Sequence, residues 1–348
     1  MRGRTTKFLK ITLFLLLTAL MIRATFSVLW LQDDIHSRSV FRDFYNLPYH
    51  SCDVIFLGAS TTRESYIAPE GFENAGVAAY SLSNGNQALE AVPYLIEEVE
   101  KTQHPYLYVI DIRKAILVDD GPYKDYGMRR LTDGMKFSLT RIKCINHLYS
   151  CREELGIEGS DLLDLYFGMS LYHSRWVNIN EEDFFTPPDV FMGYNIYSET
   201  MPLDKSVVEE KNDRCMPLND YEEGMINDLL EYLDEKGINA VFVYYPAAEE
   251  NDVKERYNSV MKMLKERGYD CINIEDHADE IGLDYTKDMK NKEHVNVYGA
   301  VKITDYLSSR IAEEYEIPDR RNDPFYQTWE ESYERFSAEM YKEQKRCS

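Results

Sequence analysis

The sequence predicts an α/β protein built on a parallel sheet that carries helices on both of its faces. Three observations predict this class: short apolar runs that end near glycine or proline, amphipathic segments between them, and the alternation of the two along the chain. Hydrophobic residues make up 44% of the 348 residues, which is enough for a large core. In such sheets functional groups gather at the carboxyl ends of the strands.

The first half of the expected domain holds three strands and a helix. Residues 53–58 (DVIFLG) form a short apolar run typical of a buried parallel strand. Residues 75–82 are a weaker second strand, and residues 106–112 are a third. Between the second and third strands, apolar residues recur at helical spacing over residues 87–101.

The same alternation resumes near residue 225. Apolar positions at helical spacing predict a helix from Met225 that ends at Gly237, and another from Val253 that ends at Gly268. Residues 239–245 and 271–274 are expected to form the fourth and fifth strands, and residues 298–314 the last helix of the domain. We therefore expect one α/β domain over residues 34–315.

Residues 114–219 interrupt this alternation. We expect them to form a helical cap or lid, with a helix-like stretch at residues 161–171 and an aromatic and basic cluster at residues 172–176 (YHSRW). After the domain, residues 316–348 carry aromatic residues at spacings of three and four. That spacing predicts a C-terminal amphipathic helix that packs on the domain.

The N-terminus carries the one long apolar run of the sequence, residues 8–31. About 24 residues suffice to cross a bilayer, and Arg23 near the outer end can reach the interface. Arg2, Arg4 and Lys7 precede the run, Lys10 lies at its start and two aspartates follow it, which predicts a cytoplasmic N-terminus. We expect residues 1–33 to be a basic cytoplasmic tip and a single-pass signal anchor, and the rest of the chain to be extracytoplasmic at the cell membrane.

Two alternatives to the anchor stay open. A cleaved signal peptide would share the basic and apolar regions, although no small-x-small cleavage site follows the run. A buried core helix is the other alternative. Residues 33–51, which are polar and aromatic, are expected to form a stalk with a short helix.

Charge and cysteines limit the classes of partner and cofactor. The formal net charge of −22 argues against a nucleic-acid partner, because a phosphate backbone would be repelled; it also fits a surface that keeps the protein soluble. The six cysteines form no CxxC and no zinc-like cluster, so neither a metal nor another cofactor is expected. Cys144 and Cys151 are close enough in sequence to be bridged, but most cysteines are interpreted as small buried hydrophobes.

Two segments carry residues suited to nucleophilic catalysis. Ser60, in the run GASTTR, follows the first strand, where a helix N-terminus favours developing negative charge. His294 lies in residues 291–300 (NKEHVNVYGA), before the last helix, and a histidine within hydrogen-bond reach is the usual base for a serine. The alternatives are a turn or helix-capping role for Ser60 and a surface or structural role for His294.

Together these segments resemble those of the SGNH/GDSL hydrolase superfamily. The residues that carry the resemblance are DVIFLGAS, ending at Ser60, and HVNVYGAVK, beginning at His294. They look closest to a membrane-anchored branch that includes D-alanine-transfer and polysaccharide acetyltransferase-like proteins. The resemblance covers roughly residues 52–115 and 220–312, and it implies a flavodoxin-like, three-layer α/β/α sheet.

The resemblance also implies roles for residues of the site. Ser60 would be the nucleophile and His294 the base, and the backbone N–H groups of Ser60 and Gly85 would stabilise an oxyanion together with the side chain of Asn84 or Asn86. The family places an aspartate three residues before the histidine, where this chain has Asn291. The family also often has an asparagine after the third strand, where this chain reads Ile110-Asp-Ile-Arg113.

Five further residues are candidate substrate contacts. Arg63 and Arg113 follow the first and third strands and could bind an anionic substrate, whereas His173, Arg175 and Trp176 could line the cleft from the cap. Each also has a plainer interpretation, as a salt bridge or as part of packing and surface hydrogen bonding.

The leading functional hypothesis is an extracytoplasmic serine esterase or O-acyltransferase that acts on acylated cell-envelope glycans. Its expected partners are the membrane, an envelope polysaccharide or teichoic-acid-like acyl substrate, and a membrane acyltransferase. The alternatives are a non-catalytic scaffold of the same fold in an envelope-modifying machine, motivated by Asn291, and a sugar-binding module that uses the aromatic cap.

Overall fold

The computed structural model describes residues 2–29, 35–117, 125–157, 159, 161–168, 172–179, 181–184, 191–205 and 213–347. Its centre is a five-stranded sheet in the order β2-β1-β3-β4-β5, with every pair parallel. The strands are β1 (Val54–Leu57), β2 (Ala79–Ser81), β3 (Leu107–Asp111), β4 (Ala240–Tyr244) and β5 (Cys271–Asn273). Each strand lies within one of the runs predicted to form a strand, so the predicted α/β class is confirmed.

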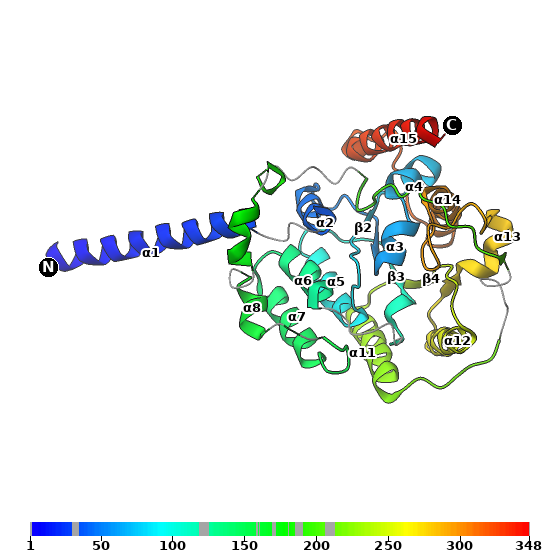
Figure 1. Ribbon diagram of the computed structural model, residues 1–348, viewed down its shortest axis with the longest axis horizontal. Coiled ribbons are helices and arrows are strands. Elements are labelled where there is room, and N and C mark those ends of the chain that lie inside the picture. Colours follow the sequence, from blue (N-terminus) through cyan, green and yellow to red (C-terminus); the bar gives the residue numbers. More distant parts are fainter. Residues whose placement is uncertain are drawn as a thin grey trace.

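Helices cover both faces of this sheet (Figure 1). On one face α3 (Ser60–Ser65) and α4 (Ala68–Ala75) pack against α14 (Val297–Glu314). On the other face η1 (Leu89–Ala91) and α5 (Val92–Val99) pack against α11 (Asp220–Lys236), beside α12 (Asn251–Glu266). Two short elements, η5 (Ile274–His277) and α13 (Ala278–Ile281), link β5 to α14.

Local sequence explains where the long helices begin and end. Asn219 and Glu222 form a reciprocal capping box that starts α11, and Gly237 ends this helix in the left-handed conformation, with φ of 62°. Asn296 starts α14 by accepting hydrogen bonds from the N–H groups of Tyr298 and Gly299. The predicted end of the first of these helices is therefore confirmed.

Residues 35–46 form α2 (Ile35–Asn46), which belongs to the core. Val40, Phe41 and Phe44 are buried, and the Tyr80 hydroxyl donates to the Val40 carbonyl at 2.7 Å. The short helix expected here is confirmed, but the expected stalk is wrong, because the apolar residues of α2 pack in the core beside β2.

The segment between β3 and β4 supplies α6 (Asp125–Gly134), α7 (Leu139–Ser150), α8 (Leu162–Tyr166), η3 (His173–Asn178) and η4 (Glu181–Asp183). In it, α7 packs against α5, and α6 packs against α2 and α7. The helix expected over residues 161–171 is short, and residues 169–171 lie outside the described residues. Through these contacts the segment packs against α5 and against α2, which lies beside β2.

The two chain ends differ in their contacts. After η6 (Pro324–Tyr326), α15 (Gln327–Cys347) packs on α4; there Trp329 is fully buried and donates from Nε1 to the Ala79 carbonyl at 2.8 Å. By contrast, α1 (Arg2–Leu29) projects from the body (Figure 1). Its stretch Thr5–Leu29 is long and apolar enough to cross a membrane. Residues 30–34, which include the two expected flanking aspartates, lie outside the described residues.

Candidate active site

Ser60 is the first residue of α3, immediately beyond the carboxyl end of β1. The turn between them is tight. A Cβ on Gly58 would lie 2.1 Å from Thr62 Oγ1 and 2.6 Å from Asp111 Cβ, so only glycine fits there. The sequence therefore places the Ser60 hydroxyl at the carboxyl edge of the sheet and its N–H in the first turn of a helix.

His294 lies in the loop that precedes α14. An isolated bridge between Met289 and Val295 closes this loop, and the Lys290 N–H donates to the His294 carbonyl at 2.9 Å. Beyond it, the Asn296 cap fixes the start of α14. The imidazole is thus held on a defined turn at the edge of the sheet.

The structure brings Ser60, His294 and Asn291 into one hydrogen-bonded line. Ser60 Oγ lies 2.8 Å from His294 Nε2, and His294 Nδ1 lies 3.0 Å from Asn291 Oδ1. The backbone N–H groups of Glu293 and His294 also donate to this Asn291 oxygen, at 2.8 and 2.9 Å.

These contacts determine the tautomer of the histidine. Two N–H donors point at the same atom of Asn291, so that atom is the amide oxygen rather than the nitrogen. Nδ1 of His294 therefore carries the proton, and the lone pair of Nε2 accepts from the Ser60 hydroxyl. Asparagine here orients the ring as an aspartate would, but without a charge.

Burial keeps the imidazole neutral. Desolvation lowers the pKa of His294 below its ordinary value, against the opposing effect of the Glu64 and Glu293 carboxylates. Glu64, on α3, is 2% exposed and pairs with Lys290 at 2.7 Å and Arg63 at 3.0 Å. The base form of His294 is therefore the favoured form near neutral pH.

The candidate oxyanion groups lie beside the Ser60 turn. The Asn84 N–H donates to the Gly58 carbonyl at 3.4 Å, which ties the loop after β2 to the end of β1. Within the described part of the chain, the N–H groups of Ser60 and Gly85 have no acceptor, and the fully buried Asn84 amide has no partner at either side-chain atom. Asn86 instead adopts a left-handed conformation, with φ of 57°, and packs against Gly127.

Asp111 ends β3, Arg113 follows it, and both hold neighbouring elements in place. The buried Asp111 carboxylate accepts from the hydroxyls of Thr61 and Thr62, the latter at 3.0 Å, and from the Arg113 N–H at 2.8 Å. Desolvation raises its pKa. The Arg113 guanidinium pairs with Glu249 and lies 3.8 Å from Glu293, next to the histidine loop.

Two arginines converge on Gly85. A Cβ built on Gly85 would lie 2.7 Å from Arg130 Nη1 and 3.7 Å from Arg63 Nη1. Arg63 was a candidate from the sequence, whereas Arg130, on α6, was not, because nothing in its local sequence indicates that the insertion reaches the loop after β2. Arg63 also pairs with Glu64 at 3.0 Å, so part of its charge is compensated within α3.

The three candidates from the cap lie elsewhere. η3 packs on α1, and Arg175 donates to the Leu29 carbonyl and pairs with Asp183 at 2.6 Å. Trp176 is 66% exposed, and His173 is exposed on the same short helix. η3 therefore lies at the end of the N-terminal helix, and the cleft-lining role expected for these three residues stays a prediction.

Among the described residues, no group of three or more histidine, cysteine or acidic side chains could hold a metal ion. The cysteines whose side chains the structure describes are free: Cys52 and Cys144, which are buried, and Cys151, Cys215 and Cys271. No family model matches the chain, and no curated protein matches it in sequence.

Proposed function

We propose that this protein is an extracytoplasmic serine esterase or O-acyltransferase that acts on acylated cell-envelope glycans. The observation that carries the proposal is the line Ser60–His294–Asn291 at the carboxyl edge of a parallel sheet. The strand order 2-1-3-4-5 is that of flavodoxin-like sheets, which supports the resemblance to SGNH hydrolases. The apolar helix Thr5–Leu29 supports attachment to a membrane.

The proposed reaction has two halves, acylation and deacylation of Ser60, and His294 carries the proton in both. His294 Nε2 takes the Ser60 hydroxyl proton while Oγ attacks the carbonyl carbon of an ester. The tetrahedral intermediate collapses, the ester C–O bond breaks, and His294 returns the proton to the leaving alcohol. Water or a sugar hydroxyl then attacks the acyl-Ser60 ester and gives its proton to His294. The bond between the acyl carbon and Ser60 Oγ breaks, the acid or the new sugar ester leaves, and His294 returns that proton to Oγ.

The negative oxygen of that intermediate needs donors that are already in place. The N–H groups of Ser60 and Gly85 are assigned this role, with the Asn84 side chain as a third donor, because all three belong to the two turns joined at Gly58. Removing one such donor typically costs about 10²–10³ in rate.

Active-site labelling tests the proposal directly. The full chain in lipid nanodiscs is treated with a fluorophosphonate and assayed with an aryl acetate, alongside Ser60→Ala and, as a matched control, Ser65→Ala on the same helix. We expect stoichiometric labelling and turnover that Ser60→Ala abolishes and Ser65→Ala retains. Full activity in Ser60→Ala would refute the assignment of the nucleophile.

One observation favours a second candidate, a non-catalytic scaffold or binding protein of the envelope-modification machinery. Asn291 supports the histidine without the charge that stabilises an imidazolium, and loss of that charge is costly in serine proteases. A folded protein that neither takes the fluorophosphonate nor hydrolyses the ester would favour this candidate.

A further inference from the structure

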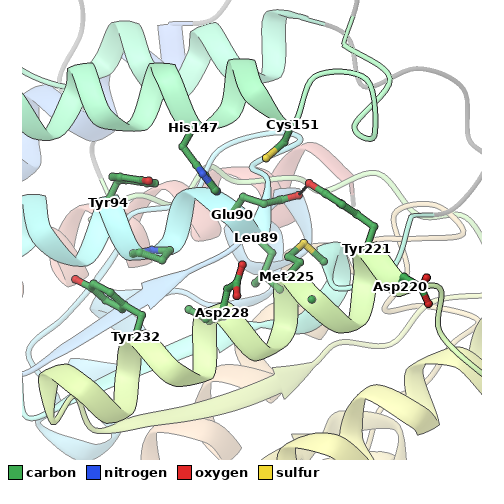
Figure 2. Close-up of a pocket in the computed structure, with 13 residues that line it drawn as sticks. Leu89, Glu90, Tyr94, His147, Cys151, Asp220, Tyr221, Met225, Asp228 and Tyr232 are labelled. Atoms are coloured by element: carbon green, nitrogen blue, oxygen red, sulfur yellow. Dashed lines mark hydrogen bonds between the residues drawn. The ribbon is translucent and has the colours of Figure 1, made fainter.

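A second pocket lies away from Ser60, on the face of the sheet opposite α4 and α14. It has a volume of about 390 Å³ and is enclosed by η1, α5, α7 and α11 (Figure 2). This volume lies within the usual range for sites of small molecules. Four apolar side chains form part of its wall: Leu89, Pro93, Met225 and Leu229.

The carboxyl groups of this pocket are its main source of charge. Three acidic side chains line it, those of Glu90, Asp220 and Asp228, and its lining within the described residues includes no lysine or arginine. Asp228 is exposed at the pocket, and no hydrogen bond or ion pair joins its carboxylate to the described part of the chain. The exposed carboxylates of Asp220 and Asp228 therefore attract a cation that enters, whereas burial raises the pKa of Glu90.

Glu90 places a second carboxyl group deeper in the wall. Its side chain is 7% exposed, and its Oε1 accepts from the Tyr221 hydroxyl at 2.5 Å (Figure 2). Its buried Oε2 has no partner among the residues that the structure describes. A buried acceptor without a donor is costly, so a donor supplied by a ligand would remove that cost.

Aromatic rings complete the lining. Tyr94 and His147 lie with ring centroids 5.5 Å apart, and Tyr232 faces the same space from α11 (Figure 2). Desolvation lowers the pKa of His147, so this ring is neutral near pH 7 and does not repel a cation. The negative faces of tyrosine rings attract cations.

Gly224 keeps the pocket open. It lies inside α11, where glycine weakens a helix, yet a Cβ at this position would meet nothing within 4 Å. Backbone packing therefore does not require glycine here, and its missing side chain leaves room in the wall.

We propose that this pocket binds a small organic ammonium ion with an apolar body. Asp228 attracts the charge, the buried Oε2 of Glu90 is the acceptor for an ammonium N–H, the tyrosine rings contact the cation through their faces, and the apolar wall takes the body. The apolar and aromatic lining distinguishes this ligand from a metal ion. The site is independent of the chemistry proposed at Ser60.

Calorimetric titration of the full chain in phosphatidylcholine nanodiscs tests the proposal, with empty nanodiscs as the reference. The probes are phenethylammonium and the neutral 2-phenylethanol, which has nearly the same shape. We expect phenethylammonium to bind about tenfold more tightly or better, because carboxylates and aromatic faces discriminate by charge. Asp228→Asn and Glu90→Gln should each weaken the ammonium about tenfold and leave the alcohol unchanged.

A matched control and a blocking variant complete the test. Glu231→Gln, on the same helix but outside the pocket, should leave binding unchanged. Gly224→Leu should abolish binding of both probes while the Tm stays the same or rises, because leucine favours the helix and fills the space. Equal affinity for the two probes, no saturation at millimolar ammonium, or undiminished binding to Gly224→Leu would overturn the proposal.

Discussion

Asn291 is the residue on which the chemistry of the site depends most. From the sequence it was a departure from the expected aspartate, and nothing in the local sequence indicated how its amide would be oriented. The N–H groups of Glu293 and His294 turn the amide oxygen towards the imidazole, so the ring has the tautomer that a base needs. What the site lacks is the charge, and two measurements on His294 follow from this.

The first measurement is the pH dependence of activity. Because the folded state lowers the pKa of His294, its neutral form persists as the pH falls through the ordinary value of 6.5. We expect the acid limb of kcat/KM for an aryl acetate to have its midpoint below pH 6.5, and the imidazole resonances observed by NMR to titrate at the same place. A midpoint above 6.5 would contradict the proposed environment of the ring.

The same residue contributes to stability in a defined direction. A group whose folded pKa is depressed binds fewer protons in the folded state than in the unfolded state below pH 6.5, so the free energy of unfolding falls as the pH drops there. The full contribution of the neutral His294 to the free energy of unfolding is therefore present above its unfolded pKa and is lost as the pH falls.

The second measurement uses Asn291→Asp. A carboxylate in this place accepts the same two backbone hydrogen bonds and adds an opposite charge beside the ring, so the pKa of His294 should rise above that of the parent protein. We expect the acid limb to move to higher pH and kcat to increase at pH 8. Asn291→Ala, which removes the acceptor of Nδ1, should lower kcat about 10- to 100-fold. A pKa that is the same in the parent and Asn291→Asp would show that residue 291 does not face the ring in solution.

At the scale of elements, Asp111 joins the end of β3 to the start of α3. Its carboxylate accepts from the Thr61 and Thr62 hydroxyls, directly after Ser60, and caps the turn that follows β3. We infer that it is a positioning residue for the nucleophile.

Replacing Asp111 should therefore affect both stability and rate. Asp111→Ala leaves two buried hydroxyls and an N–H without an acceptor, which should lower the free energy of unfolding by about 1–3 kcal/mol, measured by urea denaturation. It should also lower kcat with little change in KM. Asp234→Ala, which removes an exposed carboxylate that pairs with Arg267 and accepts from the Tyr269 hydroxyl, is the control and should change the free energy of unfolding far less. An unchanged kcat in Asp111→Ala would leave the carboxylate with a structural role only.

One side chain, that of Trp329, docks the C-terminal helix α15 on the rest of the protein. Trp329 is fully buried between α15 and the sheet edge, and its indole N–H bonds to the carbonyl of Ala79 in β2. We expect Trp329→Ala to destabilise the fold by about 3–5 kcal/mol. Phe325→Ala is the comparison: that ring is 48% exposed, and its loss should cost far less. Similar denaturation midpoints for the two variants would show that α15 does not dock.

The strands and the long helices could be predicted from the sequence because their signals are local. The run before Gly58 and the helix that ends at Gly237 each carry their own apolar spacing and stop residue. The placement of α2 and Arg130 could not be predicted, since both depend on contacts between segments far apart in the chain. The pairing of Ser60 with His294 was expected from a resemblance between motifs, not from spacing.

At the scale of the whole molecule, the body and α1 are joined by only a few described contacts. Arg38 donates to the Ser27 carbonyl at 3.4 Å, and Arg175 bonds to the Leu29 carbonyl, both at the end of the apolar helix. The side chains from Thr5 to Thr25 are exposed apart from the half-buried Thr18, which fits a helix surrounded by lipid, whereas Leu29 at the end of the helix is buried. The proposed function further requires the body to lie on the outer side, and this orientation can be tested with a cysteine of the chain itself.

Cys215 is a suitable reporter of this orientation, because it is the one exposed thiol among the cysteines that the structure describes. In a Cys347→Ser background, intact cells are treated with a maleimide that cannot cross membranes. We expect Cys215 to be labelled without permeabilisation, since positive charge before the helix retains the N-terminus in the cytoplasm. Cys215→Ser should remove the signal, and a cysteine introduced in place of Thr5 should react only after permeabilisation. If Cys215 reacts only after permeabilisation, the body lies in the cytoplasm, and an envelope glycan cannot be its substrate.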